Sequence, residues 1–155
     1  MAASAKKTSS RDVSENKPKQ SSLYRKIEKL TAYLIGRTSN VPNVPMIRTL
    51  TERLATELID CLAATGYAYS VPELDMKYKY LGEMDVHLTV ILSIIKLIAE
   101  LPQTLPSCKI MTLEQEANYI KVIDEINRER ENWMKSIQKK MNVDTPFGNL
   151  DNGNF

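Results

Sequence analysis

Two residues, Glu83 and His87, have the types and the spacing that could support metal chemistry. They are four positions apart, so on a helix a carboxylate and an imidazole would share one face and could bind one cation. A metal site needs further ligands, and His87 is the only histidine in the sequence. A single histidine on an apolar helix is more often a packed or interface residue. We therefore predict no metal site at this position.

The arrangement of the other reactive residues does not favour catalysis. His87 has no serine or cysteine placed beside it as a nucleophile, and Glu83 and Asp85 fall on different faces of a helix, which argues against an acid–base pair of carboxylates. The five glycines are scattered and form no phosphate-binding loop. We predict a protein that is not an enzyme and that uses no cofactor. A small enzyme based on Glu83 and His87 is the alternative from the catalytic class.

The cysteines and the start of the sequence bear on the cellular compartment. Cys61 and Cys108 form no CxxC pair, and Cys61 lies in an apolar helical stretch, where a buried thiol is common. Such cysteine usage is typical of a reducing environment. The first residues, MAASAKKTSSRD, lack the apolar core of a signal peptide. We predict a cytoplasmic protein.

Basic residues are the remaining candidates for a functional surface. The chain carries 21 Lys and Arg against 19 Asp and Glu, so any surface for nucleic acid must be a local patch. Arginine suits phosphate through its planar fork, whereas lysine contributes a point charge. For each residue, the alternative is a surface charge exposed to solvent. The candidate contacts with nucleic acid or a protein partner are Arg25, Lys26, Lys29, Arg37, Arg48, Arg53, Lys77 and Lys79.

These residues must be positioned by helices, because no segment alternates strictly between apolar and polar residues. The longest apolar run, Tyr78 to Leu101, repeats apolar residues every three and four positions and predicts the central helix of a bundle. Its surplus apolar surface leaves one face for a second subunit. Asp85 interrupts the main apolar row, so we expect it to be buried and paired with an arginine of a neighbouring helix.

Three further helices flank the central one in sequence. The first starts at a Ser21-Ser22 cap and ends near Gly36, the second starts at Pro45, and the last starts at a Thr112 capping box. Short connections favour an up-and-down four-helix bundle over 22–141. We predict a disordered basic tail over 1–21 and a flexible C-terminal tail over 142–155, and residues 103–110 are predicted to be a loop.

The order of several short motifs resembles a known family. The central helix contains YLGEMDVHL at 80–88, with a Leu-x-x-x-Asp-x-x-Leu pattern, and the last helix contains VIDEINR at 122–128 followed by NWMKS at 132–136. Together with Leu23-Tyr24 these motifs resemble the accessory variability determinant proteins of diversity-generating retroelements. The resemblance covers about residues 22–138. The loop after Pro42 differs, because Asn43-Val44-Pro45-Met46 stands where related chains carry lysine or arginine.

The resemblance implies a fold, an assembly and partners. Proteins of that family are four-helix bundles that form a ring-like pentamer. They bind a reverse transcriptase and its template RNA, and they support mutagenic synthesis of complementary DNA without being enzymes themselves. Two alternatives stay open: a bundle adaptor that binds only protein, and a related bundle protein encoded within ribosomal RNA intervening sequences.

Overall fold

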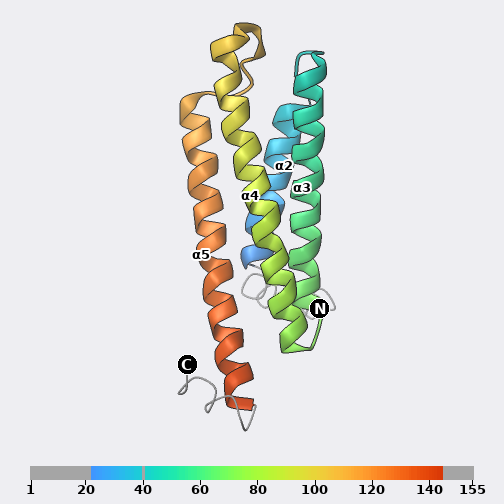
Figure 1. Cartoon of the computed structure of the whole chain (residues 1–155), viewed down its shortest axis with the longest axis vertical. Helices are drawn as coiled ribbons and strands as arrows, with labels where there is room; N and C mark the ends of the chain where they lie inside the picture. The colour runs from blue at the N-terminus through green and yellow to red at the C-terminus, as the bar shows by residue number, and fades with distance from the viewer. Residues whose placement is uncertain (1–21, 40, 145–155) are drawn as a thin grey trace, which may run out of the picture.

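The described part of the chain is an all-helical bundle. The computed structural model describes residues 22–39 and 41–144, so the predicted tail 1–21, with its Ser21 cap, and residues 145–155 lie outside the described residues. Four α-helices alternate in direction along the bundle (Figure 1), which agrees with the predicted four-helix bundle. They are α2 (Ser22–Thr38), α3 (Pro45–Ser70), α4 (Leu74–Thr104) and α5 (Leu113–Asp144), with a short 3-10 helix, η1 (Pro106–Cys108).

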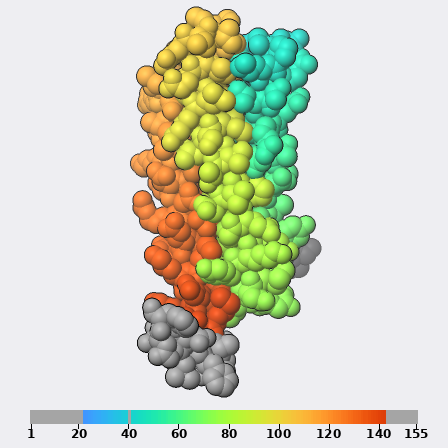
Figure 2. All heavy atoms as spheres, in the orientation of Figure 1, coloured from blue at the N-terminus to red at the C-terminus, as the bar shows by residue number. Residues whose placement is uncertain are grey.

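The helices pack in a closed order in which each has two main neighbours. Helix α4 packs against α3 and α5, and α2 completes the bundle by packing against the same two helices from behind (Figure 1). The contact between α2 and α5 is the least extensive of the four. On the opposite side, α4 runs along the middle of the surface in Figure 2, between α5 and α3, and the described helices leave its outer face uncovered.

The starts of two helices follow from local chemistry, as predicted. Pro45 occupies the first turn of α3, where its missing N–H costs no hydrogen bond. At the start of α5, the backbone N–H of Gln115 donates to the Thr112 hydroxyl over 3.1 Å, and the Thr112 N–H donates to the Gln115 side-chain oxygen over 2.9 Å. This reciprocal pair confirms the predicted capping box.

The end of α4 was predicted too early. The helix continues through Pro102 to Thr104, and its last turn is closed by a hydrogen bond from the Leu105 N–H to the Leu101 carbonyl. Proline at this point removes one helical hydrogen bond close to the end, where few residues follow. Leu101 and Cys108 bury their side chains against Ile47 in a small second core, which holds η1 in the segment predicted to be a loop.

The main core lies on the inner face of α4. The buried residues of the predicted apolar repeat are fully buried or nearly so, and they include Leu81, Met84, Leu88, Ile91 and Ile95. Buried apolar side chains of α2, α3 and α5 meet them in one cluster. Burial of each large apolar side chain contributes roughly 1.5–3 kcal/mol, so this cluster is the main source of stability. No helix in the described ranges has the length and apolar character needed to cross a bilayer.

Candidate nucleic-acid and partner surfaces

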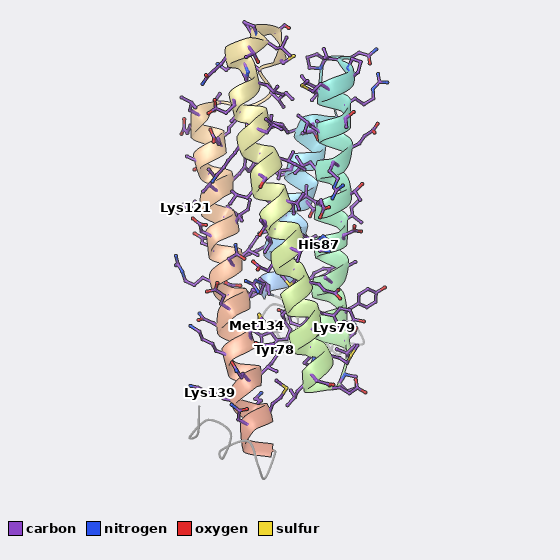
Figure 3. All side chains as sticks on the ribbon, viewed as in Figure 1. Tyr78, Lys79, His87, Lys121, Met134 and Lys139 are labelled. Carbon is purple, nitrogen blue, oxygen red and sulfur yellow. The ribbon has the colours of Figure 1, made fainter. Side chains whose placement is uncertain are left out.

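His87 forms part of a polar cluster between α3 and α4 and is not paired with Glu83. Its Nδ1 lies 2.7 Å from Glu57 Oε2, while Arg53 donates from Nε to Glu57 Oε1 over 2.9 Å. Figure 3 shows His87 on the side of α4 that faces α3. Both oxygens of the buried Glu57 carboxylate are therefore occupied. Within the described ranges, no group of three His, Cys, Asp or Glu side chains could hold a metal ion.

The electrostatics of Glu57 follow from this pairing. Burial raises the pKa of Glu57, but the hydrogen bonds and charges of His87 and Arg53 outweigh burial and leave the pKa below its usual value. A carboxylate that stays ionised and is held from two sides is suited to fixing α3 against α4. It is poorly suited to accepting a proton from a substrate near neutral pH.

Asp85 has the expected arginine partner, but it is not buried. Its side chain is 58% exposed, whereas that of its partner, Arg130 of α5, is 7% exposed. Arg130 donates from Nη2 to Asp85 Oδ1 over 3.3 Å and from Nη1 to the Leu81 carbonyl over 3.3 Å. The predicted burial of Asp85 is wrong. The buried member of the ion pair is Arg130, which reaches outward to a carboxylate at the surface. Arg130 thereby binds both the Leu81 and the Asp85 positions of the central-helix motif.

Four of the eight candidate basic residues are available for a partner. Arg25, Lys29, Arg48 and Lys79 are exposed, and no acidic side chain in the described part of the chain pairs with them. Arg25 lies near the start of α2 and Arg48 near the start of α3, which are opposite ends of the bundle (Figure 1). The structure therefore does not bring the eight residues together into one patch.

The other four candidates already have contacts or are partly covered. Lys26 pairs with Glu129 of α5, and Arg53 pairs with Glu57. The Lys77 ammonium donates to the carbonyls of Ala68, at 2.9 Å, and Tyr69, at 3.4 Å, and so satisfies the end of α3. Arg37 is half-buried, and its Nε has no hydrogen-bond partner among the described residues.

A groove of about 400 Å³ runs between α2 and α5, where the two helices pack least extensively. Aromatic and aliphatic side chains form its inner surface, and lysines, amides and one carboxylate form its rim. Tyr33 and Tyr119 meet across it with ring centroids 5.9 Å apart. The lining residues are Lys26, Lys29, Leu30, Tyr33, Gln115, Asn118, Tyr119, Val122 and Glu125.

The outward face of α4 carries apolar side chains. Val86 is 63% exposed and Leu97 is 49% exposed, and the half-buried Val90 lies between them in sequence. Positions 86, 90 and 97 are separated by four and seven residues, so they form one stripe along the helix. This stripe matches the predicted surplus apolar surface of the central helix.

Sequence reasoning missed three residues that the structure makes prominent. Glu57 borders the apolar stripe of its helix, and the only signal for it was the spacing to Arg53. Arg130 lies in the buried row of α5 with Ile126 and Ile137, and a cation inside an apolar row is a signal for a buried ion pair. Tyr119 belongs to the core cluster, and its unpaired hydroxyl becomes informative only beside the groove.

The comparisons with known proteins leave the family open. No family model and no curated protein matches the sequence, and no solved structure matches the fold.

Proposed function

We propose that this protein is a non-enzymatic accessory protein that self-associates and binds nucleic acid together with a polymerase. The uncovered apolar stripe of Val86, Val90 and Leu97 on α4 carries the proposal. Apolar side chains at this spacing are typical of helices that pack against another helix. Exposed apolar surface in a protein with a complete core usually marks an interface.

A second copy of the chain is the occupant that fits this stripe best. Both signs of charge accompany the apolar residues along α4, with Lys79 and Glu83 before Val86 and with Lys96 and Glu100 around Leu97. Charged residues of both signs beside the stripe can form ion pairs with the same residues of another copy. A partner surface that carries only one sign of charge would be repelled by part of this face. The motif resemblance supports a ring-like pentamer as the form of the assembly.

The proposed binding of nucleic acid rests on exposed basic residues and on their repetition in each subunit of an assembly. Arg25, Lys29, Arg48 and Lys79 are too few and too scattered on one subunit to bind a phosphate backbone tightly. A ring would present several copies of each residue, and linked sites gain affinity through effective concentration. Template RNA and a cytoplasmic reverse transcriptase are the partners that the motif resemblance supports. A bundle that binds only protein is the alternative that the apolar stripe alone would favour.

The test replaces Leu97 by glutamate and measures assembly and RNA binding together. We expect the parent to be an oligomer by light scattering and Leu97→Glu to have a lower mass with an intact helical spectrum. Leu113→Glu is the matched control, because Leu113 is 81% exposed at the start of α5, outside the stripe. A monomeric parent at micromolar concentration would falsify self-association.

Binding of a structured RNA is measured for the same three proteins at several salt concentrations. We expect affinity to fall steeply with salt, because released counterions drive phosphate contacts. We also expect Leu97→Glu to weaken RNA binding through the loss of the assembly. An oligomeric parent without affinity for RNA at low salt would instead identify the protein-only adaptor.

A further inference from the structure

We propose that the groove between α2 and α5 binds one unpaired nucleobase of a nucleic-acid strand. The inference rests on the proposed nucleic-acid binding and goes further, since it names a site and the chemical group that the site takes. Lys26 and Lys29, two of the eight basic residues predicted from the sequence, line the groove, but a basic residue alone does not identify a site for a base. It follows from the aromatic lining, from one unsatisfied hydroxyl of a lining residue and from the charge of the rim.

One polar group beside the groove, the Tyr119 hydroxyl, lacks a hydrogen-bond partner that a ligand could supply. Tyr119 lines the groove and is 5% exposed, and its hydroxyl has no hydrogen-bond partner among the described residues. A buried polar group without a partner costs about 1–3 kcal/mol, so a bound group that satisfies it gains that free energy. Burial raises the pKa of Tyr119, which Arg37 partly opposes, so the hydroxyl remains protonated at neutral pH. The hydroxyl is covered in this structure, so it can donate to a carbonyl or ring nitrogen of a base only when the bound base displaces the side chains around it.

An aromatic wall beside this hydroxyl can stack on a base. Tyr33 of α2 is 58% exposed, so part of its ring is free to stack although it also contacts the Tyr119 ring. Stacking of a base on an aromatic side chain contributes roughly 1–3 kcal/mol and tolerates any base, because each has a π-face. Leu30 and Val122 complete an apolar lining.

The rim offers charge for phosphate and amides for the edge of a base. Lys29 has no ion-pair partner within the described part of the chain, and Lys26 is paired with Glu129. Glu125 adds one negative charge to the rim, opposing the lysines. The rim therefore supports one or two phosphate contacts, and most of the binding free energy must come from the base itself.

The size of the groove favours a single ring system over a protein helix. Its volume of about 400 Å³ is near the lower end of small-molecule pockets, which span roughly 300–1,000 Å³. A helix with its side chains is about 10 Å wide and would need α2 and α5 to separate. One anchoring side chain of another subunit could enter, and the experiment distinguishes that outcome.

The experiment compares Tyr33→Leu and Tyr119→Phe with the parent protein. Tyr33→Leu keeps an apolar side chain and loses the stacking surface, and Tyr119→Phe keeps the ring and loses the hydroxyl. Tyr67→Leu is the matched control, because Tyr67 is 55% exposed on α3, outside the groove. The probes are a fluorescent oligouridine strand, an abasic strand with the same number of phosphates, and uridine monophosphate.

We expect Tyr33→Leu to weaken binding of the oligouridine strand by about tenfold, while the salt dependence stays unchanged because stacking releases no counterions. Tyr119→Phe should weaken binding by about threefold or more. Tyr67→Leu should remain within about twofold of the parent, and the abasic strand should not distinguish Tyr33→Leu from the parent. Uridine monophosphate should shift the methyl resonances of Leu30 and Val122.

Each other result overturns one specific claim. If the parent binds oligouridine and Tyr33→Leu binds equally well, the nucleobase site is wrong while nucleic-acid binding stands. If the parent binds no RNA but uridine monophosphate shifts the two methyl groups, the groove is a base site and the proposed function is wrong. No binding of either probe overturns both. A change of oligomeric mass in Tyr33→Leu without a change in RNA affinity assigns the groove to a subunit contact.

Discussion

Arg130 Nη2 lies 3.3 Å from Asp85 Oδ1, and this contact joins a buried cation on α5 to an exposed carboxylate on α4. Because Arg130 also donates to the Leu81 carbonyl, it fixes the two helices at one level of the bundle. Removing one partner of such a pair leaves the buried charge without full compensation. The stability of the pair therefore depends on Asp85 even though Asp85 itself is accessible to water.

We predict that Asp85→Lys lowers the free energy of unfolding by about 1–3 kcal/mol, because a second cation would face Arg130. Asp124→Lys is the control, since Asp124 is exposed on α5 and has no partner among the described residues. It should change stability by less than about 0.5 kcal/mol. Chemical denaturation of the three proteins measures the difference. Equal midpoints for Asp85→Lys and the parent would show that Arg130 does not depend on Asp85 and that its other contacts, such as the Leu81 carbonyl, are sufficient.

The Glu57 cluster predicts a loss of stability in acid. The pKa of Glu57 is lowered from 4.5 in the folded state, so the folded protein holds this carboxylate ionised more strongly than the unfolded chain does. The resulting stability is present above the unfolded pKa and is lost as the pH falls through the folded pKa. We expect the parent to lose stability between about pH 6 and pH 3 more steeply than Glu57→Gln.

Glu52→Gln is the control for this measurement, because Glu52 is exposed on the same helix and has no partner in the described ranges. The free energy of unfolding of Glu52→Gln should decrease on acidification in parallel with that of the parent. The difference in free energy of unfolding between the parent and Glu57→Gln should become smaller as the pH approaches 3. A constant difference over the whole range would mean that Glu57 contributes only packing.

Cys61 should be chemically inert in the folded protein. Burial raises the pKa of its thiol to about 12, and the side chain is 0% exposed. Alkylating reagents attack the thiolate, so modification requires unfolding or a large local opening. In a Cys108→Ser variant, where Cys61 is the remaining thiol, iodoacetamide should react slowly in buffer and quickly in denaturant. Rapid reaction in buffer would show that the core opens at α3.

The sequence was sufficient for the fold because its strongest signals act locally. Pro45 and the Thr112–Gln115 pair determine helix starts within one turn, and the apolar repeat of the central helix determines which face is buried. The end of α4 depends on a distant contact, the burial of Leu101 and Cys108 against Ile47. Local sequence patterns do not show this contact, so Pro102 was interpreted as the end of the helix.

The candidate site was harder to predict, because exposure and pairing depend on neighbouring helices. The position of Asp85 in an apolar row suggested burial, but that row borders α5, and Arg130 reaches Asp85 from inside the core. A list of basic residues also could not separate Lys77, which binds carbonyls of α3, from Lys79, which is exposed. The groove between α2 and α5 arises from loose packing between helices distant in sequence.

Lys77 and Lys79 allow a direct test of which lysines serve the fold. The Lys77 ammonium binds the Ala68 and Tyr69 carbonyls, which are among the last in α3 and lack partners within the helix. It also lies 5.9 Å from the centroid of the Trp133 ring, which packs against Tyr69. Lys77→Met keeps the apolar stem and removes the charge, so we expect the free energy of unfolding to fall by about 1–2 kcal/mol.

Lys79→Met is the matched control, and its stability should stay within about 0.5 kcal/mol of the parent. RNA affinity separates the two roles further. If Lys79 contacts phosphate, Lys79→Met should weaken binding and make the salt dependence shallower, because one fewer counterion is released. Lys77→Met should change stability more than affinity, since its ammonium already has two acceptors. The opposite pattern, with full stability and weakened RNA binding in Lys77→Met, would show that the ammonium leaves α3 to bind phosphate.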